Sequence, residues 1–371
     1  MASSEMAPSE VASSDNSSVA WKSLVRRSVE AWYPPKKATH AMAEDFLGSY
    51  TDLDDFLVNS GSMGTLTGMF WFFQRREAFL SQKTMTKWSR DRLDDYILLP
   101  ASHGFVTRTE CFFVSHFWQS KNDPDPGGEY LQLVKMELGL QSWSFVWVDW
   151  TCLPQDPRSN TEEVYFLRGL ETMPAIIRNC GFMWNYPPFK PRLWILYEVA
   201  EYSLTCDGGI EVTPDNKDFV DHVKEMREAG VRATLSRHGY ECKVERDKEF
   251  LTAWLELLVL LKRLLIDVGN IRHILDNLTW FPVTGNMYIN TPRGLVMLHP
   301  FEGTLTLGGE EYKFTPFPLW RDGKLPIHTK SAPTETHQAS GRDDSKNEVS
   351  QEESQERIVK YRYRDGVLRM E

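Results

Sequence analysis

The sequence predicts an α/β fold in which a parallel β-sheet is flanked by helices. Strand-like and helix-like segments alternate between residues 108 and 213, and this alternation implies parallel pairing with helices on both faces of the sheet. The strand-like segments are apolar nearly throughout, as central parallel strands are expected to be. Two of them end in polar clusters, and the carboxyl edge of such a sheet is where α/β proteins usually hold their sites.

The expected elements of this region are strands at 111–115, 145–150, 181–186 and 210–213, and helices at 129–140, 161–179 and 192–204. Thr161 is the expected N-cap of the second helix, because its hydroxyl can accept a backbone N–H and acidic residues follow it in the first turn. Pro174 lies inside that helix and is expected to kink it.

The rest of the chain is expected to contain a disordered start (1–20), a helical extension that packs on the core (21–107), a helical and then β-rich region (216–329), a disordered linker (330–356) and a β-hairpin (357–371). The disordered segments have too little apolar surface to offset chain entropy. Helix candidates within the extension are 21–32, 52–58 and 66–80. Asp365-Gly366 is the expected turn of the hairpin.

Composition excludes several classes of protein. The net charge of −10 argues against non-specific binding to nucleic acid or to an anionic membrane. The most apolar run, 251–266, carries three charged residues, which indicates a buried amphipathic helix rather than a membrane span. Five cysteines without a C-x-x-C pair predict a reducing compartment, and the N-terminus resembles no targeting peptide. We therefore expect a cytoplasmic protein.

Three motifs lie at the expected strand ends and on the last helix. The first strand ends in Ser-His-Phe-Trp (115–118), and the second runs into Asp-Trp-Thr-Cys-Leu-Pro-Gln (149–155). The helix carries Trp194 and Glu198, which lie on one face because they are four residues apart. Polar groups from three elements are therefore expected at one edge of the sheet.

These motifs resemble the Toll/interleukin-receptor-like (TIR-like) superfamily over residues 108–213, and the second is similar to its fungal heterokaryon-incompatibility (HET) branch. The HET pattern is an aliphatic residue, Asp, two variable residues, Cys, an aliphatic residue, one more and Gln. The resemblance implies a flavodoxin-like sheet. In NAD-cleaving TIR domains the Glu of the Trp-x-x-x-Glu helix is catalytic, which implies this role for Glu198. Ile195 departs from the pattern, since many TIR domains have Cys there.

Glu198 has a chemically sufficient role in such a reaction. A carboxylate near the ribose can stabilise an oxocarbenium-like state, and the leaving nicotinamide needs no strong acid. The alternative is a solvated helix residue or a partner of Arg192. Trp194 would wall the nicotinamide pocket or, alternatively, anchor the helix in the core.

Ser115, His116 and Trp118 are the expected ligand-binding residues of the first strand. At the carboxyl end of a parallel strand Ser115 and His116 can reach phosphate or ribose oxygens, and His116 can carry a proton. The alternative for His116 is a hydrogen bond of purely structural value.

Asp149 and Gln155 are candidate ligand contacts of the second motif. Asp149 is expected chiefly to cap the following loop through backbone amides, because a buried carboxylate must be paired. Gln155 would bond a ligand or its own loop. Cys152 is expected to be a buried small hydrophobe, and together with His116 and Glu198 it lacks the spacing of a metal site.

Three functions are compatible with these residues. The first is a NAD glycohydrolase or cyclase that acts in a cell-death or incompatibility-type response, with NAD as substrate rather than cofactor. The second is a non-catalytic module that self-associates through helices and the loop at 151–160. The third is an accessory nucleotide-binding protein of a small-molecule pathway.

Overall fold

The computed structural model describes residues 8–32, 39–61, 68–101, 104–120, 122–280 and 287–318, and two short strands near the C-terminus, 361–364 and 367–370. Residues 1–318 form one compact unit, and residues 319–371 form a second. The expected linker at 330–356 and the turn at 365–366 lie outside the described residues.

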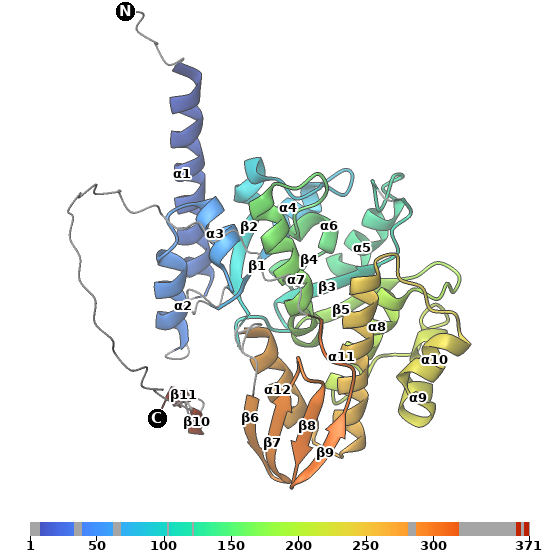
Figure 1. Cartoon of the computed structure of the whole chain (residues 1–371). Helices are drawn as coiled ribbons and strands as arrows, with labels where there is room; N and C mark the ends of the chain where they lie inside the picture. Colours follow the sequence, from blue (N-terminus) through green and yellow to red (C-terminus); the bar gives the residue numbers. More distant parts are fainter. Residues whose placement is uncertain are drawn as a thin grey trace, which may run out of the picture. The chain divides into compact units, whose positions relative to one another are not determined.

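In the described part of the chain, strands and helices are interspersed between residues 70 and 205, helices precede and follow this region, and strands return at 287–313 (Figure 1). The helices are α1 (Pro8–Ala31), α2 (Thr39–Gly48), α3 (Leu53–Asn59), α4 (Arg76–Ser81), the 3₁₀ helix η2 (Arg90–Asp95), α5 (Glu129–Gly139), α6 (Asp149–Cys152), α7 (Asn160–Asn179), α8 (Leu193–Thr205), α9 (Lys217–Ala229), α10 (Val231–Arg237), α11 (Glu245–Arg263) and α12 (Val268–Trp280). The strands are β1 (Phe70–Arg75), β2 (Tyr96–Pro100), β3 (Cys111–His116), β4 (Phe145–Trp147), β5 (Gly181–Asn185), β6 (Met287–Thr291), β7 (Gly294–His299), β8 (Thr304–Leu307), β9 (Glu310–Lys313), β10 (Tyr361–Arg364) and β11 (Val367–Met370).

The central sheet is mixed rather than fully parallel. Its strand order is β2-β1-β4-β3-β5. β3 pairs in parallel with β4 and β5, whereas β1 pairs antiparallel with both β2 and β4. The α/β class is therefore confirmed, and the expectation of an entirely parallel sheet is corrected by β1, which runs antiparallel to both of its neighbours.

Those two strands come from the extension that we expected to be helical. The helix predicted at 66–80 is wrong in its first half, because Phe70–Arg75 forms β1 and only Arg76–Ser81 is helical. All four aromatic residues from Phe70 to Phe73 are buried. A strand covered on both faces has no polar alternation, so periodicity does not separate it from a buried helix.

Four further local expectations differ from the structure. Residues 8–20, expected to be disordered, belong to α1, since their Ala, Ser and Glu are compatible with a helix that continues from 21–31. The second strand ends at Trp147, and no strand forms at 210–213 within the described residues. The N-cap of α7 is Ser159 rather than Thr161, because Ser159 and Glu162 form a reciprocal capping box.

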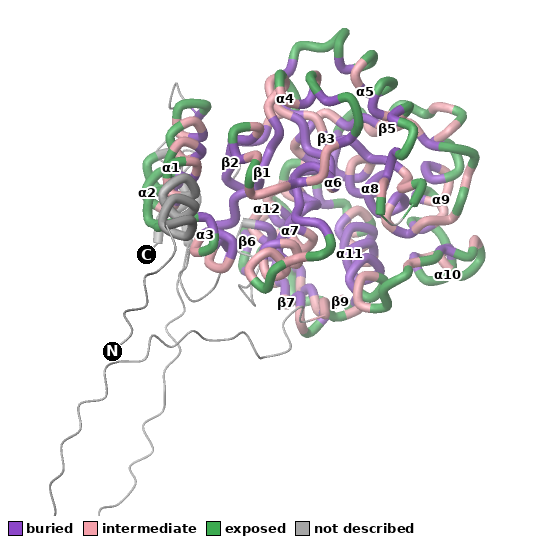
Figure 2. The backbone as a smooth tube through the Cα atoms, turned by 90° about the horizontal axis from the view of Figure 1, so that it is seen from above, coloured by how far each residue is buried: buried purple, intermediate pink, exposed green. Residues whose placement is uncertain are grey.

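Helices cover both faces of the parallel strands. On one face, Val114, Val146 and Met183 pack against Leu131 and Val134 of α5. On the other, the rings of Phe113, Trp147 and Phe182 stack, and Phe182 stacks in turn on Tyr202 of α8. Figure 2 shows the buried residues gathered in the sheet and in the helices around it. Consecutive residues of β3 therefore point to opposite layers.

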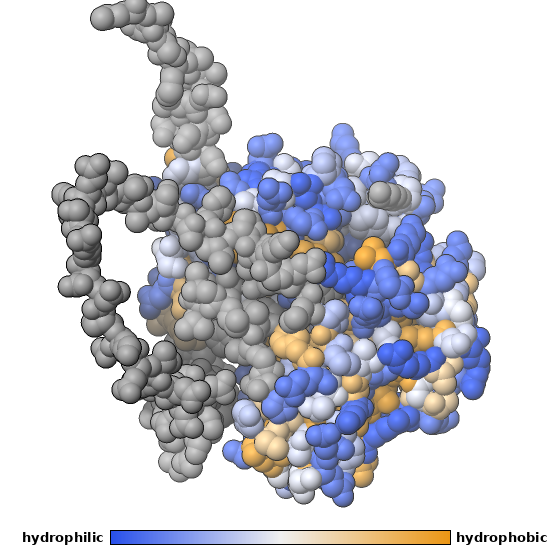
Figure 3. Space-filling view, viewed as in Figure 1, coloured by the Kyte–Doolittle hydropathy of each residue, from blue (hydrophilic) through white to orange (hydrophobic). Residues whose placement is uncertain are grey.

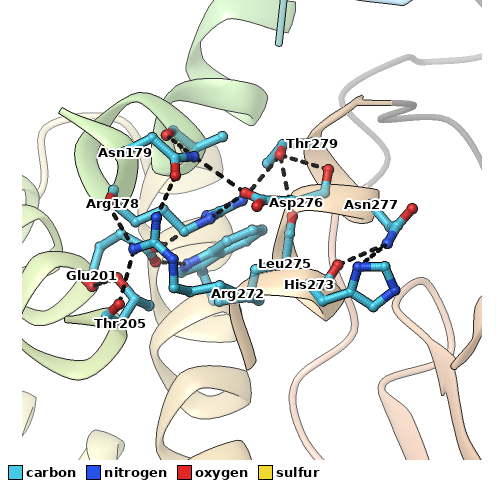
Figure 4. Close-up of polar contacts among 12 residues, drawn as sticks. Arg178, Asn179, Glu201, Thr205, Arg272, His273, Leu275, Asp276, Asn277 and Thr279 are labelled. Carbon is cyan, nitrogen blue, oxygen red and sulfur yellow. Dashed lines mark hydrogen bonds and ion pairs between the residues drawn. The ribbon is translucent and has the colours of Figure 1, made fainter. Parts of the chain in front are cut away.

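The helices that follow the sheet are joined by a buried ionic network. Arg178 of α7 is fully buried and donates to Glu201 of α8 (2.9 Å) and Asp276 of α12 (2.7 Å) (Figure 4). Trp254 of α11 donates to the other oxygen of Glu201 at 2.7 Å. One guanidinium thus connects helices that are far apart in sequence, which fixes the position of α8.

The β-rich region forms a four-stranded antiparallel sheet, β6-β7-β8-β9. Phe317 beyond it packs on Trp254, so this region is anchored on α11. The face in Figure 3 is largely hydrophilic, with apolar patches over the lower part where β6–β9 lie. Tyr288 of β6 and Leu295 of β7 are exposed. β10 and β11 of the second unit pair antiparallel, as the expected hairpin requires.

Candidate functional site

Ser115 and Glu198 meet at the carboxyl end of β3. Ser115 is the fifth residue of β3, and its hydroxyl donates a hydrogen bond to Oε2 of Glu198 in the middle of α8. The hydroxyl of Tyr186, just after β5, lies 2.7 Å from the same Ser115 oxygen. Ser115 is 1% exposed and Glu198 is 9% exposed. Glu198 therefore lies beside the carboxyl end of β3, and its carboxyl group is shielded from bulk water.

Burial dominates the electrostatics of Glu198. It raises the pKa of the Glu198 carboxyl to about 8; the Ser115 hydrogen bond opposes this rise, and the nearby Asp149 charge adds to it. The carboxyl group is therefore mainly protonated at neutral pH. A cationic group placed beside it would favour the ionised form, so its charge can respond to a bound cation.

His116 lies on the other face of the sheet, because neighbouring strand residues alternate. Its Nε2 is 2.9 Å from Oδ1 of Asp149, and its ring stacks on Tyr130 of α5 with centroids 5.3 Å apart. Trp118 donates from Nε1 to the other Asp149 oxygen at 2.9 Å. Asp149 thus joins two of the expected ligand-binding residues, and neither Ser115 nor Glu198 belongs to this second cluster.

Tyr130 connects the two clusters. Its hydroxyl donates to the backbone oxygen of Ser115 at 2.8 Å, while its ring lies against His116. Burial raises the pKa of the Tyr130 hydroxyl well above its usual value, and the Glu198 charge adds to this effect. Sequence reasoning missed both Tyr130 and Tyr186. The signal for Tyr186 was available, because it ends the third predicted strand at the same edge of the sheet.

Asp149 starts α6 instead of ending a strand. Its Oδ1 accepts from the amide of Trp150 at 2.6 Å, which agrees with the expected contact to a backbone amide. Gln155 is folded on its own loop, since its amide donates to the backbone oxygens of Asp149 (2.9 Å) and Leu153 (3.1 Å). Gln155 therefore holds the turn that begins at Asp149 in place. Its carboxamide nitrogen makes both of these hydrogen bonds and is not available to a ligand.

Trp194 does not join either cluster. It lies near the carboxylate of Asp247 on α11 and packs edge-on against Tyr197. These contacts fit the alternative in which Trp194 anchors its helix. Cys152 is fully buried and donates to the Val146 carbonyl, and burial raises the pKa of its thiol to about 11. It is therefore poorly suited to act as a nucleophile.

The side of the site nearest to solvent is formed by half-buried residues. Tyr130, Asp149, Trp118 and Arg192 are all partly exposed, and Arg192 donates to the Trp118 carbonyl at 3.5 Å while its guanidinium lies over Phe117. Nδ1 of His116 is buried and has no hydrogen-bond partner among the described residues. A ligand that approached past Trp118 would meet a polar, largely aromatic surface.

The residues that the structure describes contain neither a cluster of metal-ligating side chains nor a helix that could span a membrane. In these parts of the chain no three His, Cys, Asp or Glu side chains gather as a metal ion would require. The helices given above include none with the length and apolar character needed to cross a membrane.

Comparison of the chain with protein-family models, with curated proteins and with solved structures finds no match. The relationship to TIR-like and HET-like domains therefore stays a prediction based on the three motifs.

Proposed function

We propose that the protein is a TIR/HET-like enzyme that cleaves the bond between ribose and nicotinamide in a NAD-type nucleotide, with Glu198 as the catalytic residue. The observation that carries the proposal is the buried Ser115–Glu198 pair at the carboxyl edge of the parallel strands. An α/β sheet holds ligands at this edge. The chain would act as a glycohydrolase or cyclase in a cell-death or incompatibility-type response, in the cytoplasm.

The raised pKa of Glu198 suits a cationic substrate. The nicotinamide ring of NAD is positively charged, and the ribose becomes oxocarbenium-like as the bond breaks. Binding of this cation would favour the carboxylate form of Glu198, which then stabilises the positive charge of the transition state in a low-dielectric site. Nicotinamide leaves as a neutral molecule, so no proton donor is required for its departure.

The remaining residues would bind and orient the nucleotide. Ser115 holds the Glu198 carboxyl group in position through a hydrogen bond, and the Tyr186 hydroxyl in turn contacts the Ser115 hydroxyl. The unpartnered Nδ1 of His116 would accept a hydrogen bond from a ribose hydroxyl, and Asp149 fixes the orientation of the imidazole. Trp118 would form the outer wall of the site.

Nicotinamide release from NAD by the purified full-length protein tests this proposal. Chromatography should show nicotinamide together with ADP-ribose or its cyclic form, and Glu198→Gln should abolish both products. Glu228→Gln, a change at an exposed glutamate of α9, is the matched control and should keep full activity. A thermal-shift titration with NAD reports binding separately, because a ligand of the native state raises the melting temperature.

A second function is favoured by an apolar stripe on α5. Leu133 and Met136 of α5 and its C-cap residue Leu140 are exposed and recur with helical spacing, with Leu140 87% exposed. Such a stripe supports a non-catalytic module that self-associates. Of the loop expected to contribute, 151–155 is buried and only the following residues are accessible. Under this alternative Met136→Glu would reduce the mass of the oligomer measured by light scattering, and Glu198→Gln would have no effect.

A further inference from the structure

A pocket lies at the edge of the central sheet opposite to Ser115 and Glu198. It has a volume of about 400 Å³, and its polar lining comes from Thr107, Arg108, Asn179, Thr205, Asp207 and Arg272. Apart from Arg272, which comes from α12, these residues lie just before β3, just before β5 or at the end of α8, so the pocket lies at the amino ends of the parallel strands. Because β3 runs from Cys111 to His116, the pocket is separated from the Glu198 site by the length of a strand, about 16 Å.

Arg272 reaches from α12 to the ends of two other helices (Figure 4). Its Nη1 donates to the backbone oxygens of Arg178 (2.8 Å) and Thr205 (3.0 Å), the latter being the last residue of α8. Its Nη2 donates to the side-chain oxygen of Asn179. These bonds fix the guanidinium rigidly and leave its Nε–H without a partner in the described part of the chain.

Arg108 is held beside it. Its Nη2 donates to the same Arg178 carbonyl at 3.0 Å and to the sulfur of Cys206, and its guanidinium lies over the Tyr202 ring. Since one carbonyl oxygen accepts from both arginines, their bonded nitrogen atoms lie no more than about 6 Å apart. Among the described residues neither Arg108 nor Arg272 forms an ion pair.

The two positive charges repel each other. Burial lowers the pKa of the Arg272 guanidinium; the nearby Asp276 opposes this effect, while the charges of Arg178 and Arg108 add to it. Asp276 and Glu201 already pair with Arg178. Asp207 is the carboxylate in the lining, and it is exposed and interacts with Lys262. An anion bound between the two guanidiniums would relieve this repulsion.

Capping of helix ends explains part of this arrangement. Guanidiniums commonly bond the last carbonyls of a helix, as Arg263 does at the end of α9 with the carbonyls of Arg227 and Met226. One such arginine suffices for an end. Two arginines on one carbonyl, both facing a pocket and both with unused N–H groups, exceed what capping requires.

We propose that this pocket binds a small soluble phosphomonoester, whose phosphate lies between Arg108 and Arg272. A phosphate monoester carries close to two negative charges at neutral pH and three oxygens that accept several N–H donors. The forked geometry of guanidinium suits such a group. Asn179, Thr107 and the rest of the pocket would contact the organic part. This site is independent of the proposed chemistry at Glu198.

Thermal-shift titrations of the full-length protein test the proposal, with ribose 5-phosphate and inorganic phosphate as probes and sodium chloride at matched ionic strength. Ribose 5-phosphate should raise the melting temperature saturably, and chloride should not. Thr107→Glu places a carboxylate at the pocket, where it would pair with the arginines and abolish the response without loss of fold. Asp207→Asn should strengthen binding severalfold, because it removes the carboxylate of the lining.

Arg272→Lys and Arg263→Lys are a matched pair. Each replaces a guanidinium that bonds helix-end carbonyls, so both should lower stability to a similar extent. Only Arg272→Lys should weaken the response to ribose 5-phosphate, by about tenfold or more in apparent Kd. Equal responses to phosphate and chloride in the unaltered protein, or an unchanged response in Thr107→Glu, would overturn the proposal. If ribose 5-phosphate raised the melting temperature no more than inorganic phosphate does, the proposal that the ligand has an organic part would be wrong.

Discussion

The Ser115 hydroxyl at the end of β3 donates a hydrogen bond to the Glu198 carboxyl group on α8, across a sequence separation of 83 residues. Both side chains are buried, and the contact lies between the sheet and the helix layer that covers it. Burial and this bond act in opposite directions on the Glu198 pKa. The pair therefore sets the pH range in which Glu198 carries a charge.

Ser115→Ala should raise the pKa of Glu198 further above about 8, because the alanine leaves burial unopposed. Carbon-13 NMR of labelled glutamate would follow the titration directly. Tyr186→Phe keeps the ring and removes the hydroxyl that contacts Ser115, so its effect should have the same direction and a smaller size. A fall in the Glu198 pKa in Ser115→Ala would contradict this description of the pair.

Glu198 should make the folded protein less stable as pH rises from 4.5 to 8. The native state keeps the Glu198 proton up to a pKa of about 8, whereas in the unfolded chain the carboxyl group has its usual pKa of 4.5 and loses the proton there. The native state therefore binds more protons in this range, and stability is lost as pH rises. Relative to Glu198→Gln, the loss should be on the order of 3–5 kcal/mol, which urea unfolding at pH 5 and pH 8.5 would measure. If the free energies of unfolding of the two proteins changed with pH in parallel, this prediction would be wrong.

The buried Arg178 network should be essential for stability. Arg178→Met leaves the carboxylates of Glu201 and Asp276 without their buried partner and should cost about 3–5 kcal/mol in urea unfolding. Addition of Glu201→Gln should recover part of this loss, because it removes one of the uncompensated charges. Lys217→Met breaks an exposed ion pair on α9 and should leave the unfolding midpoint unchanged.

The stacked imidazoles of His222 and His238 should reduce stability in acid. Their centroids are 3.6 Å apart, and burial together with the His238 charge lowers the pKa of His222, while Glu225, Asp218 and Asp221 oppose this. The unfolded chain then binds more protons, so stability is lost as pH falls below about 6.5.

His222→Gln should therefore show a smaller drop in melting temperature between pH 7 and pH 5 than the unaltered protein. The same drop in both proteins would show that the histidine pair has no influence.

The sequence predicted the parallel strands and the position of Glu198 because both depend on local patterns. Apolar runs marked β3, β4 and β5, and the Trp-x-x-x-Glu spacing placed Glu198 on a helix behind them. The strand β1 was missed, since an apolar segment buried on both faces has no distinguishing period. The contacts of the candidate site residues depend on packing between segments that are far apart in the sequence.

Trp194 and His116 show that effect for the candidate site. Trp194 shares a helix face with Glu198 in sequence, but the packing of α11 against α8 directs it to Asp247. His116 follows Ser115 directly, and the alternation of the strand sends it to the opposite layer, where Asp149 and Tyr130 receive it. The sequence around Trp194 or around His116 does not indicate these partners, because the partners lie in other segments of the chain.

The pH dependence of nicotinamide release from saturating NAD tests the central claim most directly, with Glu198→Gln and Glu228→Gln measured beside the unaltered protein. We expect the rate to rise with pH and to level off with an apparent pKa below about 8, because the bound cation favours the Glu198 carboxylate. Glu198→Gln should release no nicotinamide at any pH, and Glu228→Gln should match the unaltered protein. Release by Glu198→Gln at the rate of the control, or no release by the unaltered protein between pH 6 and pH 9.5, would contradict the assignment of Glu198.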